Sequence, residues 1–192
     1  MRIWLIRHGL TVLGEEKRYQ GSTDTPLSGA GRLALQPDDR FTRVCCSPLL
    51  RAVETAEILF PSAEKRMIPD LREMDFGVFE GRGWWEMEQD SAYRAWVAGS
   101  CEGRCPGGED RAGFSARVQA AFAAIIERER AAGASDLVIV AHGGTLMAAL
   151  SRWGSPHKDY FAWQTPCASG WLLEDTDWPD RLHVIKEVSF VR

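Results

Sequence analysis

The sequence has no long apolar run. Among its 192 residues no stretch reaches the roughly 18 apolar residues that a membrane-spanning helix needs. The apolar run at residues 3–6 is also too short for a signal peptide. We therefore expect a cytoplasmic protein that does not contact a membrane.

Positive charge is not in excess either. The chain carries 23 Lys and Arg against 27 Asp and Glu, which gives a formal net charge of −4, and the basic residues are scattered. No basic stripe is available to neutralise a polyanionic backbone, which argues against a nucleic-acid partner. An apolar content of 45% is enough to bury the core of a single domain spanning residues 1–192.

The cysteines do not form a recognisable framework. There are five of them, an odd number, and Cys45 and Cys46 are adjacent, so that in a strand they point to opposite faces. Cys101 and Cys105 lack the second pair or nearby His that would complete a tetrahedral metal site. No Gly-rich loop with a following Lys is present, which argues against a nucleotide-dependent kinase. We expect no disulfides, no metal and no cofactor.

Two buried strands, each ending at a histidine, stand out from the rest of the sequence. Residues 3–6 and 137–141 are short, continuous apolar runs rich in branched side chains, a pattern typical of strands buried on both faces of a parallel sheet. His8 follows the first run and His142 follows the second. Ligands of α/β proteins bind at the carboxyl ends of such strands, so both histidines are candidates for a site.

The remaining pattern completes a three-layer α/β fold, with a mostly parallel central sheet and helices on both faces. Ser47 and Pro48 predict the N-cap and first residue of a helix that runs to residue 60. Apolar spacing predicts an amphipathic helix over 114–130, with Gly133 as its stop. Further strands are expected to end at Cys46 and to cover 170–174 and 182–188.

Residues 82–107 differ in character and predict a small helical cap inserted in the domain. Aromatic and apolar side chains alternate there with charges, and glycines follow. Trp84, Trp85 and Trp96 either stack on a substrate or form the core of the cap, and we expect the core for most of them.

Both strand ends suit a phosphate. Fixed positive charge, hydrogen-bond donors and backbone amides at helix N-termini bind this dianion, and Arg7-His8-Gly9 and His142-Gly143-Gly144 can supply them. Arg51 falls in the first turn of its helix, where a cation is unfavourable unless an anion lies nearby. The alternative is a surface pair with a carboxylate such as Glu54.

These residues also suit nucleophilic chemistry. An imidazole attacks if one ring nitrogen is unprotonated and a hydrogen bond to the other fixes the tautomer. Breaking a phosphate ester also requires a proton for the leaving oxygen. Glu73 and Asp75 are both candidates for that donor, and their spacing does not separate them.

An ordered series of motifs resembles the histidine phosphatase superfamily, also called the phosphoglycerate mutase-like family. The series covers residues 1 to about 150. Its segments are Leu5-Ile6-Arg7-His8-Gly9 with Thr11, Arg18-Tyr19-Gln20-Gly21, Asp24-Thr25-Pro26-Leu27-Ser28, Ser47-Pro48-Leu49-Leu50-Arg51-Ala52 with Thr55-Ala56, Leu71-Arg72-Glu73, Gly77-Val78-Phe79-Glu80-Gly81, Pro106-Gly107-Gly108-Glu109 and Val140-Ala141-His142-Gly143-Gly144. One such triplet is weak evidence, whereas the whole series in family order is strong.

The resemblance implies a role for each matching residue. His8 is expected to form a phosphohistidine, Glu73 to donate the proton, and Arg7, Arg51 and His142 to hold the phosphate. The remaining expected substrate contacts are Thr11, Gln20, Gly21 and Gly143. Such a pocket stabilises phosphoryl oxygens with cations and donors, without a metal.

Two departures from the family pattern concern the site and one edge of the fold. Leu10 and Gly14 stand where members often carry Glu and Asn, and the segment between Gly31 and Arg43 is shorter than usual. The first departure predicts the loss of a secondary phosphate donor, and the second predicts a trimmed edge.

Among subfamilies the chain most resembles the alpha-ribazole phosphatases of cobalamin synthesis. We therefore expect a phosphomonoesterase acting on a small phosphate ester, with alpha-ribazole 5′-phosphate as the candidate. A phosphoglycerate mutase and a non-catalytic module that binds phosphorylated ligands are the alternatives. The sequence leaves a homodimer open.

Overall fold

The fold is built on one seven-stranded mixed sheet, described by a computed structural model that covers residues 1–191. The strands are β1 (Arg2–Arg7), β2 (Arg43–Cys46), β3 (Glu64–Met67), β4 (Asp136–Ala141), β5 (Gly154–Ser155), β6 (Ser169–Glu174) and β7 (Leu182–Ser189). Their order is β3-β2-β4-β1-β6-β7-β5, and β6 runs antiparallel to both of its neighbours. The predicted mostly parallel sheet is confirmed in β3, β2, β4 and β1.

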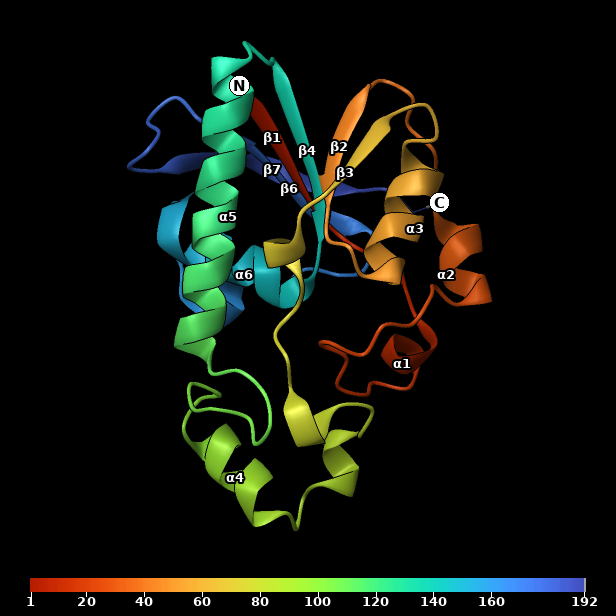
Figure 1. Ribbon diagram of the computed structural model, residues 1–192, viewed down its shortest axis with the longest axis vertical. Coiled ribbons are helices and arrows are strands. Elements are labelled where there is room, and N and C mark those ends of the chain that lie inside the picture. Colours follow the sequence, from red (N-terminus) through yellow and green to blue (C-terminus); the bar gives the residue numbers. More distant parts are fainter. Residues whose placement is uncertain (192) are drawn as a thin grey trace.

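Helices cover both faces of the sheet, which confirms the three-layer α/β architecture (Figure 1). They are α1 (Val12–Glu15), α2 (Gly29–Ala34), α3 (Leu50–Leu59), α4 (Ser91–Ala98), α5 (Arg111–Ala131) and α6 (Gly143–Trp153). One core cluster joins α5 and α6 to one sheet face, and a second joins α3 to the other. None of the helices within residues 1–191 combines the length and the apolar character needed to cross a membrane.

The pairing of β1 with β4 brings the two histidine segments together. The strands are parallel and in register, with Arg7 opposite Ala141. His8 and His142 therefore leave the sheet side by side, and their ring centroids lie 5.1 Å apart. His8 and His142 are 134 residues apart in sequence, and the register of β1 with β4 explains why they are neighbours in space.

Two local expectations were incomplete. Strand β3, Glu-Lys-Arg-Met, escaped prediction because it has no apolar pattern; it lies at the sheet edge, where exposed charges discourage pairing with another chain. Helix α3 starts at Leu50 rather than Pro48, and Ser47 is not its N-cap. The short α2, which ends at Ala34, agrees with the trimmed segment expected after Gly31.

The cap contains α4 and a short 3-10 helix at Trp84–Glu86, and its core is continuous with Phe114 and Val118 of α5 and with Ala148 of α6. Trp96 is buried in that core as expected, whereas Trp84 and Trp85 are 52% and 43% exposed. The chain segments entering and leaving the cap are hydrogen-bonded to each other. Val78 N–H donates to Pro106 O at 3.0 Å, and Glu109 N–H donates to Asp75 O at 2.9 Å.

Candidate active site

His8 is held in the tautomer that a nucleophile requires. Its Nδ1 lies 2.7 Å from the carbonyl oxygen of Gly9. Since a carbonyl only accepts, Nδ1 carries the proton and Nε2 keeps a free lone pair. Burial, and then the charges of Arg51 and Arg7, holds the pKa of His8 well below its usual value. The ring is therefore neutral around pH 7, with Nε2 available for attack.

His142 presents a hydrogen-bond donor beside His8. Its Nε2 lies 2.7 Å from the hydroxyl of Ser47, which already accepts a hydrogen bond from Leu49 N–H. The Ser47 hydroxyl proton has no other acceptor among the described residues, so it is donated to Nε2 and the ring proton lies on Nδ1. That buried Nδ1 has no partner among residues 1–191. Ser47 therefore sets the tautomer of His142, a role the sequence pattern concealed because Ser-Pro also fits a helix start.

Arg51 is fully buried and fixed by backbone carbonyls. Its two terminal nitrogens donate to Gly21 O at 2.7 Å and to Thr23 O at 2.9 Å. Glu54, the alternative partner considered from sequence, is instead taken by Arg32 and by Leu27 N–H. No carboxylate forms an ion pair with the Arg51 guanidinium within the described chain, so its charge acts on the site.

The loop that holds Arg51 is itself organised by Glu80. The Glu80 carboxylate accepts hydrogen bonds from the backbone N–H groups of Gly21, Ser22 and Thr23. It also accepts one from Phe76 N–H, at the base of the cap. A side chain at residue 21 would collide with Met74 O, only 1.8 Å from the position of its Cβ. Gly21 is thus required for the loop to pass this point.

Unpaired buried donors converge around His8. Arg7 Nη1 donates to Thr165 O at 2.7 Å, but Arg7 Nε is buried with no partner among the described residues. The same holds for Arg51 Nε and His142 Nδ1. Leaving a buried donor unpaired costs about 1–3 kcal/mol, so a cluster of them indicates an absent acceptor. An anion next to His8 would supply that acceptor.

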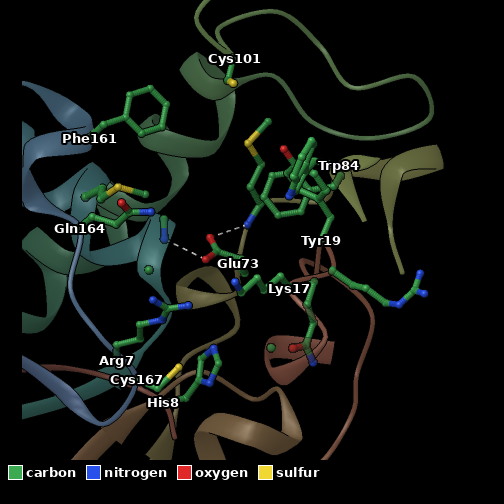
Figure 2. A pocket seen from close by; sticks show the side chains of 18 of the residues that line it. Arg7, His8, Lys17, Tyr19, Glu73, Trp84, Cys101, Phe161, Gln164 and Cys167 are labelled. Atoms are coloured by element: carbon green, nitrogen blue, oxygen red, sulfur yellow. Dashed lines mark hydrogen bonds between the residues drawn. The ribbon is translucent and has the colours of Figure 1, made fainter. Parts of the chain in front are cut away.

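Glu73, and not Asp75, faces this cluster. It is 9% exposed, and its carboxylate accepts from Met74 N–H at 2.9 Å and from Gly144 N–H at 2.8 Å (Figure 2). Burial raises its pKa above the ordinary value, against the lowering effect of those hydrogen bonds and of Arg51. Asp75 binds Ser22 and Gly77 N–H outside the cavity. The structure thus separates two carboxylates that spacing could not.

A cavity of about 570 Å³ opens above these residues. Arg7, His8 and Glu73 line its base, while Arg51 and His142 are fully buried and do not line it. The upper walls are largely aromatic and come from the cap, from the segment after α1 and from the 3-10 helix at Tyr160–Trp163 (Figure 2). The aromatic lining residues are Tyr19, Phe76, Trp84, Trp96, Tyr160 and Phe161.

The other expected contacts fall into two groups. Thr11, Gln20 and Gly143 line the cavity, whereas Gly21 acts through its carbonyl on Arg51. The Thr11 hydroxyl donates to Gln20 Oε1 at 2.6 Å, which orients that amide. A Cβ at residue 143 would lie 3.6 Å from Arg7 Nε, an ordinary van der Waals distance, so a side chain there would pack against the Arg7 guanidinium.

Two supporting residues were not assigned a role from sequence. Thr55 accepts a hydrogen bond from Gly9 N–H at 2.8 Å and donates to Arg51 O, which joins α3 to the loop after β1. Lys17 also lines the cavity. Thr55 belongs to one motif of the family series, whereas Lys17 carries no periodic or strand-end signal, so only the spatial arrangement brings Lys17 to the site.

Comparison with known proteins agrees with this geometry. Residues 3–178 match the family model described as the histidine phosphatase superfamily, branch 1. The chain is 35% identical to the probable phosphoglycerate mutase GpmB of Salmonella paratyphi B over 153 residues, which cover 74% of this chain and 70% of that protein.

Two solved structures share the fold over nearly their whole length. The alpha-ribazole phosphatase of Shigella flexneri superimposes with a TM-score of 0.81 at 28% identity, covering 96% of this chain and 94% of that one. A phosphoglycerate mutase of Thermus thermophilus gives a TM-score of 0.69 at 30% identity, covering 98% and 99%. The fold is therefore shared by phosphatases and mutases.

The sheet, the paired histidines and these relatives together define a phosphatase or mutase. The chain belongs to the histidine phosphatase superfamily.

Proposed function

We propose that the chain is a phosphomonoesterase that works through a phosphohistidine on His8. The observation that carries this proposal is the free lone pair of His8 Nε2 beside buried donors on Arg7, Arg51 and His142 that lack acceptors. A phosphoryl group at Nε2 would meet both the nucleophile and the charge it requires. Because side chains supply that charge, catalysis is proposed to need no metal.

The proposed reaction has two steps. In the first, His8 Nε2 attacks phosphorus, the ester P–O bond breaks, and protonated Glu73 gives its proton to the leaving oxygen. In the second, water attacks the phosphohistidine while the Glu73 carboxylate takes its proton, which releases phosphate and restores both residues. The raised pKa of Glu73 suits a group that alternates between acid and base.

The proposed substrate is a small phosphate ester with a ring in its leaving group, and alpha-ribazole 5′-phosphate is the candidate. The aromatic walls above His8, including exposed Trp84, could stack on such a ring. The similarity to an alpha-ribazole phosphatase supports the same choice.

A phosphoglycerate mutase is the second candidate, favoured by the 35% identity to a probable mutase. A mutase shares the first step and differs in the second, where a substrate hydroxyl replaces water as the acceptor. Net isomerisation of 3-phosphoglycerate that exceeds phosphate release would establish this alternative.

The test is phosphate release from a panel of esters in excess chelator, with a His8→Ala variant alongside. The panel contains alpha-ribazole 5′-phosphate, 3-phosphoglycerate, sugar phosphates and an aryl phosphate. We expect chelator-resistant turnover that falls to background in the variant, and a phosphorylated intermediate in intact-mass spectra of wild type only. Full activity of His8→Ala would contradict the mechanism, and binding without release across the panel would indicate a non-catalytic module.

A further inference from the structure

Lys17 differs from the other cations that line the upper cavity. Arg18 forms ion pairs with Glu16 and Glu86. Arg111 forms an ion pair with Glu102 and stacks over the Tyr160 ring at 5.0 Å. The Lys17 ammonium has no hydrogen-bond or ion-pair partner within residues 1–191. It is therefore a charge in the cavity wall that no protein group compensates.

The backbone holds Lys17 in an unusual conformation. It follows α1 with φ +54°, in the left-handed region, and its N–H donates to Gly14 O at 3.1 Å. A residue with a long side chain pays about 1 kcal/mol or more for this conformation, which glycine or asparagine adopts more readily. Its acidic neighbours face elsewhere, since Glu15 accepts from Ser28 and Glu16 from Arg18.

The side chain of Lys17 extends across the cavity toward Glu73, below Tyr19 and Trp84 (Figure 2). It nevertheless lies nearer to solvent than the proposed phosphoryl site does. Lys17 is exposed, whereas His8, Arg51 and His142 are buried, so Lys17 stands on the solvent side of the cavity. Lys17 is therefore placed beside the leaving group of a bound ester rather than beside its phosphoryl group.

We propose that Lys17 binds an anionic group, a carboxylate or a second phosphate, on the leaving-group part of the substrate. This inference rests on the proposed phosphatase chemistry at His8, and it favours esters other than alpha-ribazole 5′-phosphate, whose leaving group is a neutral nucleoside. The esters that Lys17 selects carry two anionic groups. The phosphoryl group lies at His8, the second anion contacts Lys17, and the portion of the substrate that joins them lies between the aromatic walls of the cavity. An ammonium serves both anions, because it acts as a point charge without the planar geometry of arginine.

The test compares matched esters that differ only in the second charge. Phenyl phosphate is paired with 4-carboxyphenyl phosphate and with 1,4-phenylene bisphosphate, and glycerol 3-phosphate with 3-phosphoglycerate. Lys17→Asn removes the charge and tolerates the left-handed backbone, Lys17→Arg keeps the charge, and Lys65→Asn is a control on the exposed strand β3.

We expect wild type to prefer the charged member of a pair. Lys17→Asn should lower the kcat/KM ratio of charged to neutral ester about tenfold or more, as expected when a charge-assisted hydrogen bond is lost. Lys17→Arg should restore most of the ratio and Lys65→Asn should leave it unchanged. Comparison of 4-carboxyphenyl phosphate with 1,4-phenylene bisphosphate shows whether Lys17 prefers a carboxylate or a second phosphate.

A ratio that Lys17→Asn leaves unchanged, or an absence of charge preference in wild type, would overturn the assignment even if His8-dependent turnover of phenyl phosphate persists. Turnover of phenyl phosphate that does not depend on His8 would instead count against the proposed function.

Discussion

At the scale of single residues, burial acts on the site in opposite directions. It lowers the pKa of His8 and raises that of Glu73. His8 therefore stays unprotonated down to lower pH than in water, and Glu73 stays protonated up to higher pH. Each shift favours the neutral form. The neutral forms are the ones that the proposed first step uses, a free imidazole on His8 and a proton donor on Glu73.

The role of Glu73 predicts a dependence on the leaving group. Glu73→Gln cannot donate the proton, so kcat/KM for an alkyl phosphate should fall by about 10²–10⁴. An aryl phosphate with an acidic phenol needs less protonation and should lose much less. Steady-state kinetics on the two esters measures this difference.

Asp75→Asn is the matched control, because Asp75 lies two residues away and outside the cavity. It should keep the ratio of alkyl to aryl rates. Equal losses on both esters in Glu73→Gln would show that Glu73 supports the structure of the site rather than proton transfer.

At the scale of elements, the two strand ends depend on a close approach between β1 and β6. Gly170 in β6 pairs with Ile6 in β1, and a Cβ at residue 170 would lie 1.9 Å from Leu5 O. The obstacle is backbone in the middle of the sheet, which cannot move aside as a flexible side chain would. Glycine here lets β1 keep the position from which His8 projects.

Gly170→Ala should consequently lower the free energy of unfolding by about 3 kcal/mol or more, at or above the usual range for overpacking. Urea unfolding of the two proteins measures the change. Gly29→Ala is the control, because the corresponding Cβ meets nothing within 4 Å at the start of α2. A Gly170→Ala protein as stable as Gly29→Ala would contradict the predicted contact.

Whether a strand could be predicted from the sequence depended on whether it carries a continuous apolar run. Strands β1 and β4 were evident because buried parallel strands are continuous apolar runs, and each directly positions a histidine. Strand β3 is charged and exposed and has no such run. The partners of Ser47 and Lys17 lie far from them in sequence or outside the protein, so no local pattern could indicate them.

At the scale of the whole molecule, the site destabilises the fold that carries it. Around His8 and His142 the protein buries unpaired donors and the charge of Arg51. Both histidines have a pKa well below the usual value. The unfolded chain can therefore bind protons that the folded chain excludes.

This linkage gives the pH dependence of stability a definite sign. As pH falls below about 6.5, each histidine of the unfolded chain gains a proton while the folded one stays neutral, so the free energy of unfolding falls by up to about 1.4 kcal/mol per pH unit and histidine. Glu73 acts in the opposite sense, since its raised pKa favours the folded state as pH falls toward its ordinary value.

His8→Asn removes one of the two titrating groups and should reduce the slope of stability against pH between about pH 7 and pH 5. Urea unfolding across this range, in buffers without phosphate, compares the variant with wild type. An unchanged slope would mean that the folded protein protonates His8 as easily as the unfolded chain does.

The closed base of the cap has a consequence for how this architecture can diversify. Because Val78 is bonded to Pro106 and Glu109 to Asp75, the two ends of the insertion are tied together before the chain returns to α5. A segment joined in this way can change in length or composition while its anchorage remains in place. Glu80 lies just beside that junction and holds the loop of Arg51. Exchange of residues 82–107 can thus change the part of the cavity wall formed by Trp84 and Trp96 while the residues around His8 stay in place.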